Sequence, residues 1–137
     1  MSNEVPKLSA ASTAGATVLV IDDSNTIRRS AEIFLRQGGY RVVLAEDGFD
    51  ALSKVDDHEP ELVFCDILMP RLDGYQTCAI IKRNPRYARL PVIMLSSKDG
   101  LFDKARGRMV GAEDYLTKPF TKEQLLRAVD QYRRVTA

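Results

Sequence analysis

The sequence predicts an α/β fold in which a parallel β-sheet is covered on both faces by helices. Two observations lead to this class. Five short apolar runs rich in β-branched residues recur along the chain, and segments with an apolar residue at every third or fourth position separate them. Continuously apolar strands belong to a sheet that is buried on both faces. Right-handed crossovers then place the intervening helices on both of those faces.

The predicted strands are the five apolar runs. They cover residues 18–21, 42–44, 62–65 and 92–95, with a weaker run at 115–117. With 137 residues the chain is about one domain long. Five strand–helix units of this length suit a flavodoxin-like (βα)5 doubly wound sheet with strand order 2-1-3-4-5. Ligands of such sheets bind beyond the carboxyl ends of the strands, where the first and third strands lie side by side.

Periodicity and end signals predict one helix after each strand. Gly38–Gly39 should stop the first, Asn84–Pro85 the third and Gly111 the fourth, while Thr121 and Gln124 form a capping box at the start of the last. The apolar positions expected to face inward are, in chain order, Ile27, Ala31, Phe34 and Leu35; Ala51, Leu52 and Val55; Cys78 and Ile81; Leu101, Ala105 and Met109; and Leu125, Val129 and Tyr132.

The composition indicates a single folded domain in a reducing compartment. Residues 1–16 are small and polar, so we expect a disordered N-terminal tail there and the folded domain over 17–137. The net charge of +1 gives no reason to expect a nucleic-acid partner. No apolar run is long enough for membrane insertion, and the two cysteines lie inside apolar stretches. We therefore expect a cytoplasmic protein.

Polar residues follow four of the predicted strands. Asp22 and Asp23 come after the first strand, Asp66 after the third, Ser96 after the fourth and Lys118 after the fifth. Because the carboxyl ends of parallel strands meet at one edge of a sheet, these side chains should lie together. Alone, an Asp pair after a strand is usually a helix cap and a single Asp or Ser a turn residue. Their joint placement favours a functional site.

Three converging carboxylates require a nearby cation. A like-charge pair at about 4 Å costs about 4 kcal/mol at an effective dielectric near 20. Oxygen ligands favour Mg²⁺, and Lys118 adds a second positive charge. Such a site stabilises a phosphoryl group that is transferred to a carboxylate, and central Asp66 is our candidate nucleophile. His58 lies in an acidic segment and is interpreted as a solvated helix end.

The motifs at the strand ends are specific to one family. From about Val18 to Val135 the chain resembles the CheY-like receiver domains of two-component response regulators, through VLVIDDS, DILMPRLDG, VIMLSS and YLTKPF in that order. The resemblance implies that 17–137 is a receiver domain and assigns roles to individual residues. These are Asp66 as phosphoacceptor; Asp22, Asp23, Asp66 and the Leu68 carbonyl around Mg²⁺; Ser96, Tyr115 and Lys118 as phosphate-binding and switch residues; and Pro119 after a cis peptide bond.

A closer resemblance concerns the pathway. DGFDAL, MPRLDGYQTC, VIMLSSKDGLFDKA and YLTKPF are similar to stand-alone regulators of type IV pilus chemosensory systems, which implies a role in twitching motility. The expected partners of this family are a histidine kinase, as phosphodonor, and an output protein that the sequence does not identify. Output would use the surface of the fourth helix, fifth strand and fifth helix. We expect a monomer that is not an enzyme.

Three alternatives compete with an output switch. A Mg²⁺-dependent phosphohydrolase with an aspartyl-phosphate intermediate would need a substrate pocket and a second acid two residues after Asp66, where Leu68 stands. A nucleotide-binding domain would need a glycine-rich phosphate loop, and neither GxxxxGK[ST] nor GxGxxG occurs. A regulator that only drains phosphate from a shared kinase would have the same sequence features as an output switch.

Overall fold

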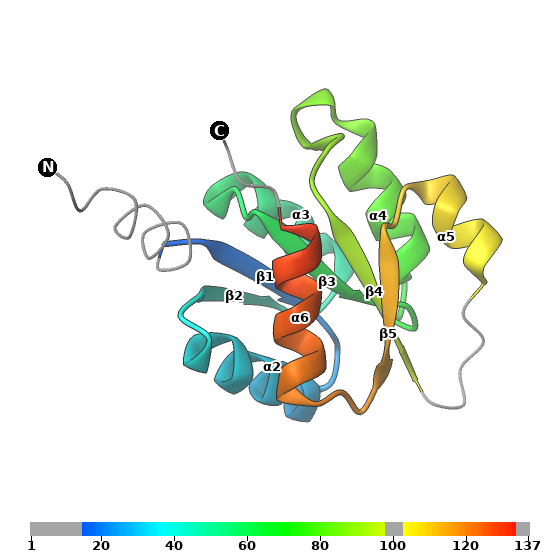
Figure 1. Ribbon diagram of the computed structural model, residues 1–137. Coiled ribbons are helices and arrows are strands. Elements are labelled where there is room, and N and C mark those ends of the chain that lie inside the picture. The colour runs from blue at the N-terminus through cyan, green and yellow to red at the C-terminus, as the bar shows by residue number, and fades with distance from the viewer. Residues whose placement is uncertain (1–14, 98–102, 134–137) are drawn as a thin grey trace, which may run out of the picture.

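The structure is a computed structural model that describes residues 15–97 and 103–133. Its centre is a five-stranded parallel sheet in the order β2-β1-β3-β4-β5 (Figure 1). The predicted fold class and strand order are therefore confirmed. The strands are β1 (Thr17–Ile21), β2 (Arg41–Ala45), β3 (Leu62–Asp66), β4 (Val92–Ser97) and β5 (Asp114–Lys118).

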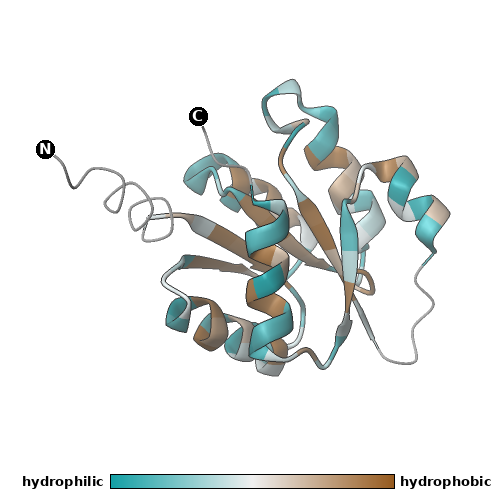
Figure 2. Cartoon of the chain, in the orientation of Figure 1, coloured by the Kyte–Doolittle hydropathy of each residue, from teal (hydrophilic) through white to brown (hydrophobic). Residues whose placement is uncertain are grey.

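Helices cover both faces of this sheet. On one face α2 packs beside α6, and on the other α3, α4 and α5 follow one another (Figure 1). Hydrophobic residues concentrate on the strands and on the inward sides of the helices (Figure 2). The helices are α2 (Asn25–Gln37), α3 (Gly48–His58), α4 (Gly74–Arg83), α5 (Lys104–Val110) and α6 (Lys122–Tyr132), with a 3₁₀ turn, η1, at Pro85–Tyr87.

The strands divide the core into two layers because successive side chains of a strand point to opposite faces. Leu19, Val63 and Met94 pack toward the α3–α4 side, and Val18 and Phe64 toward the α2–α6 side. All five side chains are fully buried. The apolar residues therefore alternate between two cores, which explains why these strands have no polar face.

Side-chain caps fix where the helices begin. The residues before α2, α3, α4, α5 and α6 each accept a hydrogen bond from a backbone N–H three positions later; they are Ser24, Asp47, Asp73, Asp103 and Thr121. Two of these starts are full capping boxes, Asp73 with Gln76 and Thr121 with Gln124. The capping box predicted at the start of the last helix is confirmed.

One predicted helix face is wrong. We expected Leu101, Ala105 and Met109 to face inward, but Ala105 is exposed and Met109 is 86% exposed. Leu101 lies outside the described residues. Helix α5 begins only at Lys104, and its buried residue is Gly107, so its inner face lies two positions away from the predicted stripe.

The termini contribute two further observations. The tail expected over residues 1–16 lies outside the described residues except for its last two positions. Of these, Ala16 is buried, and its carbonyl accepts a hydrogen bond of 2.8 Å from the N–H of Arg41. Among the helices of the described residues, none combines the length and the apolar character needed to span a membrane.

Candidate functional site

The register of the sheet brings three carboxylates together. Ile21 of β1 lies opposite Cys65 of β3, so the residues that follow them, Asp22 and Asp66, emerge side by side at the carboxyl edge. One carboxylate oxygen from each of Asp22, Asp23 and Asp66 lies within 4.8 Å of the others. Asp22 and Asp66 are buried, whereas Asp23 is exposed. The cluster therefore consists of two buried carboxylates and one carboxylate, that of Asp23, that is open to solvent.

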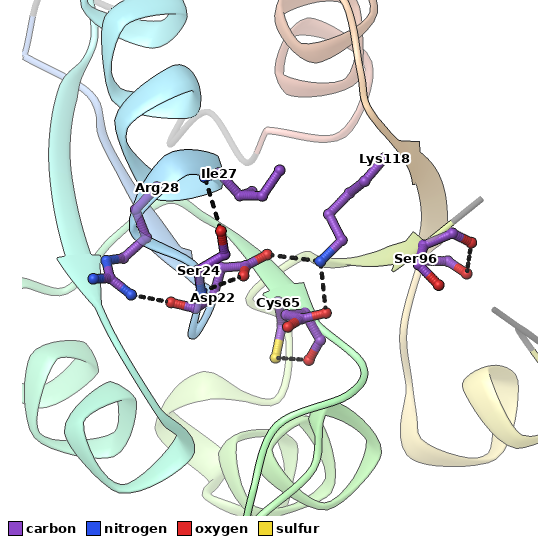
Figure 3. Close-up of polar contacts among 9 residues, drawn as sticks. Asp22, Ser24, Ile27, Arg28, Cys65, Ser96 and Lys118 are labelled. Atoms are coloured by element: carbon purple, nitrogen blue, oxygen red, sulfur yellow. Dashed lines mark hydrogen bonds and ion pairs between the residues drawn. The ribbon is translucent and has the colours of Figure 1, made fainter. Parts of the chain in front are cut away.

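Lys118 joins the two buried carboxylates. Its Nζ lies 3.0 Å from Oδ2 of Asp22 and 3.0 Å from Oδ1 of Asp66. Figure 3 shows the side chain reaching from the end of β5 across the edge of the sheet toward Asp22. The Lys118–Pro119 peptide bond is cis. Because one ammonium serves two carboxylates, the cluster keeps an excess of negative charge.

Asp22 is held by groups that the sequence analysis did not single out. The backbone N–H of Ser24 donates to Asp22 Oδ1 at 2.9 Å, and the guanidinium of Arg28 donates to the Asp22 backbone carbonyl (Figure 3). Ser24 also caps α2 through the N–H of Ile27 at 3.3 Å. The Asp–Asp–Ser order after β1 is a recognisable cap signal. Nothing in the sequence pattern indicated Arg28.

Burial and neighbouring charges shift the pKa values of both Asp66 and Lys118. Desolvation and the charge of Asp22 outweigh the hydrogen bond from Lys118, which raises the pKa of Asp66 to about 7. Burial alone would lower the pKa of Lys118, but the hydrogen bonds and charges of Asp66 and Asp22 raise it above its ordinary value. Lys118 therefore stays protonated at neutral pH.

The cluster opens into a hollow large enough for a small anion. It measures about 190 Å³, and its lining consists of Asp23, Asp66, Ile67, Leu68, Ser96, Ser97 and Lys118. Ser96 is buried and its hydroxyl donates to the Ser97 carbonyl at 3.3 Å (Figure 3). Leu68 is 69% exposed at the rim. Acidic, hydroxyl and ammonium groups therefore surround a space open to solvent.

The structure does not bring Tyr115 into this hollow. Tyr115 lies on β5, is half-buried, and lines a second hollow of about 280 Å³ with Lys104, Arg108 and Asp114. Lys104 Nζ is 5.8 Å from the centre of the Tyr115 ring. His58, at the end of α3, is exposed.

Gly74 is a second residue that sequence reasoning did not single out. A Cβ atom at this position would lie 2.3 Å from the Asp66 carbonyl oxygen and 2.8 Å from Cα of Ile67. The Gly74 N–H donates to the Ile67 carbonyl at 2.8 Å. The start of α4 therefore packs directly on the backbone of Asp66, and only glycine fits there. The Asp–Gly pair at a helix start was the available signal.

The donor set fits a hard divalent cation. Carboxylate oxygens from three residues converge, and the carboxylate of Asp23 faces solvent. Mg²⁺ prefers such oxygen ligands and usually retains several water molecules. Zinc sites, by contrast, use cysteine and histidine; both cysteines, Cys65 and Cys78, are buried free thiols inside the core.

Comparison with known proteins decides the family. Residues 18–130 match the response regulator receiver domain. This chain belongs to the response regulator receiver family. It is 64% identical over 115 residues to PilG of Pseudomonas aeruginosa, covering 84% of this chain and 85% of that protein. It is 37% identical to the regulator PhoP of Bacillus subtilis, covering 79% of this chain and 44% of that protein.

Solved receiver domains share this fold. The chemotaxis protein CheY4 of Vibrio cholerae superposes with a TM-score of 0.82 at 33% identity, covering 87% of this chain and 99% of that one. The receiver domain of a sensor histidine kinase from Pseudomonas aeruginosa superposes with a TM-score of 0.79 at 30% identity, covering 87% and 98%. That neighbour was solved with a magnesium ion coordinated in its active-site cleft.

Proposed function

We propose that this receiver domain, over residues 17–137, is a phosphorylation-driven switch of a pilus chemosensory pathway. Asp66 accepts a phosphoryl group from a histidine kinase, and the surface of α5, β5 and α6 presents the result to a protein partner. The observation that carries the proposal is the pair of 3.0 Å contacts from Lys118 to Asp22 and Asp66 beside an open hollow. The 64% identity to PilG supports the pathway.

The transfer step uses the chain's own groups. An Asp66 carboxylate oxygen forms a bond to phosphorus while the bond from phosphorus to the donor imidazole nitrogen breaks, and its electron pair stays on that nitrogen. Lys118 holds one phosphoryl oxygen by charge and hydrogen bond, and the Ser96 hydroxyl can donate to another. No base is required by the ionised form of Asp66, which attacks directly; with a pKa of about 7 this form is present at neutral pH.

Asp22, Asp23, Asp66 and the main-chain carbonyl of Leu68 would hold Mg²⁺. When bound, Mg²⁺ supplies positive charge that offsets the charge of the phosphoryl oxygens. The role of Asp22 is then to hold its carboxylate in a fixed position, since Ser24 and Lys118 both donate hydrogen bonds to it.

The switch step links Asp66 to the second hollow. A phosphoryl group adds acceptor oxygens beside Ser96, and movement of the Ser96 hydroxyl toward it leaves space that the half-buried Tyr115 can occupy. Tyr115 and Lys104 line the hollow beside α5, so this change alters the surface a partner contacts. A partner shifts the population only by its differential affinity for the two states.

Phosphotransfer from a purified phosphohistidine donor tests the proposal. Label should reach the wild-type chain only with Mg²⁺, and its bond should be cleaved by hydroxylamine, as expected of an acyl phosphate. Asp66→Asn should take up no label. His58→Ala is the matched control and should be labelled like the wild type. Label that persists in Asp66→Asn, or without Mg²⁺, would contradict the assignment.

A further inference from the structure

A group of side chains connects α4 to the start of α5. Tyr75, in the first turn of α4, is buried, and its hydroxyl oxygen accepts a hydrogen bond of 2.9 Å from the backbone N–H of Asp103. Asp103 is the cap of α5, and its carboxylate accepts a hydrogen bond of 3.0 Å from the N–H of Arg106. The position of the α5 cap therefore depends on a side chain of α4.

Arg106 completes the connection from the α5 side. Its guanidinium carbon lies 4.4 Å from the centre of the Tyr75 ring, and its Nη2 lies 3.7 Å from Oδ2 of Asp73. Asp73 caps α4 in the same way that Asp103 caps α5. We refer to Asp73, Tyr75, Asp103 and Arg106 as the Tyr75 cluster. Its contacts join the first turns of two neighbouring helices.

The other end of the cluster adjoins the acceptor. Gly74 lies between Asp73 and Tyr75, and it is packed so closely on Asp66 that a methyl group at Gly74 would lie 2.3 Å from the Asp66 carbonyl oxygen. Close-packed interiors transmit displacements because they contain little free space. A shift of the Asp66 backbone must therefore move the first turn of α4, and Tyr75 with it.

We propose that Tyr75 is a positioning residue of the switch, through which a change at Asp66 reaches the first turn of α5. This route runs along α4 and is separate from the route through Ser96 and Tyr115. The inference rests on the proposed function, because phosphorylation of Asp66 is its input. Since Lys104 and Arg108 of α5 line the second hollow, the cluster adjusts the surface that a partner contacts.

Amide hydrogen exchange of α5, with and without beryllofluoride, tests this inference. Beryllofluoride with Mg²⁺ forms a complex on a carboxylate that mimics an acyl phosphate, and fluorine NMR reports its occupancy. In the wild type, exchange at 104–110 should differ between the two states. Tyr75→Phe keeps the ring and loses the hydroxyl. In this variant the occupancy by beryllofluoride should be unchanged. The difference in amide exchange at 104–110 between the two states should be at least about twofold smaller than in the wild type. Arg106→Gln should reduce it too.

Tyr87→Phe is the matched control. Its hydroxyl donates to Asp56 at 2.7 Å, on the α3 side of the molecule, so its loss should leave the response of α5 unchanged. If Tyr75 had only a structural role, Tyr75→Phe would change amide exchange at 104–110 equally with and without beryllofluoride. The difference between the two states would then stay as large as in the wild type. An undiminished difference in both Tyr75→Phe and Arg106→Gln overturns the inference and spares the proposed function. Absence of a bound fluorine signal in the wild type overturns both.

Discussion

The Lys118 ammonium lies 3.0 Å from Oδ1 of Asp66, while Asp22 places a second carboxylate at the same distance from it. Asp22 directly follows β1, Asp66 is the last residue of the neighbouring strand β3, and both are almost completely buried. Their mutual repulsion is present before any ligand binds. Lys118 therefore contributes both to the stability of the fold and to the chemistry of the site.

Replacing Lys118 should destabilise the metal-free protein. Lys118→Met leaves two buried carboxylates without their cation, and breaking such a buried pair costs about 3 kcal/mol or more. Urea unfolding in the presence of EDTA measures the loss. Lys54→Met is the control, because the Lys54–Asp50 pair is longer, at 3.5 Å, and partly exposed; its loss should be under about 1 kcal/mol. Equal losses for the two variants would refute the assigned role of Lys118.

Magnesium should stabilise the folded chain. A ligand that binds only the native state adds about 2.7 kcal/mol at a concentration of 100 times its Kd. Asp23→Asn should abolish this gain at little intrinsic cost, because Asp23 is exposed. The midpoint of urea unfolding, measured with and without Mg²⁺, checks the prediction. Asp57→Asn, an exposed substitution on α3, is the control and should keep the full stabilisation by Mg²⁺. If the stabilisation by Mg²⁺ survives in Asp23→Asn, Asp23 is not a ligand of the ion.

A single methyl group at Gly74 should disturb the acceptor. In Gly74→Ala the new Cβ meets the Asp66 backbone at 2.3 Å, so β3 and α4 must separate. Overpacking of this kind typically costs about 1–3 kcal/mol, and label uptake at Asp66 should fall as well. In Gly38→Ala the obstacle is the flexible Leu126 side chain at 2.5 Å, which can move. If Gly38→Ala is the more damaging change, the close packing at Asp66 is not limiting.

Neither cysteine should react in the native protein. Burial raises the pKa of Cys78 to about 12 and that of Cys65 well above its ordinary value, so thiolate is scarce at pH 8. Iodoacetamide should leave both unmodified until urea unfolds the chain, when two adducts should appear by mass spectrometry. One rapid adduct under native conditions would show that a thiol is accessible.

The C-terminal helix should show a pH-dependent contribution. The Tyr132 hydroxyl donates to Oδ2 of Asp114 at 2.8 Å, and this bond raises the pKa of Tyr132 above its ordinary value. The folded pKa exceeds the unfolded value near 10, so the stabilisation is complete below pH 10 and is lost as pH rises through the folded pKa. Tyr132→Phe should therefore cost about 1 kcal/mol at pH 8 and much less at pH 11. A constant difference between these pH values would contradict this.

The fold was predictable because its signals are local. Apolar runs such as 62–65 mark buried strands, and a capping box marks Thr121. The side chains that follow the strands could be assigned to one edge because parallel strands share their direction. The placement of Asp22, Asp66, Ser96 and Lys118 at one edge needed only that topology.

Other features depend on tertiary contacts that no local pattern specifies. Met109 is exposed because α5 starts later than its periodicity suggests and turns Gly107 inward. The stacking of Arg106 on Tyr75 joins residues of two different helices, and helix packing sets their separation in space. A sequence pattern indicates which side of a helix is apolar, but it does not show which neighbouring element that side contacts.

The two outer strands of the sheet present charged residues at their ends. β5 begins with Asp114 and ends with Lys118, and β2 begins with Arg41. Charges on edge strands discourage another chain from extending the sheet, which would otherwise lead to fibrous aggregates. Lys118 is committed to the two carboxylates of the site, so it is Arg41, exposed at the start of β2, that provides such a charge; an apolar residue in its place would weaken a safeguard against self-assembly.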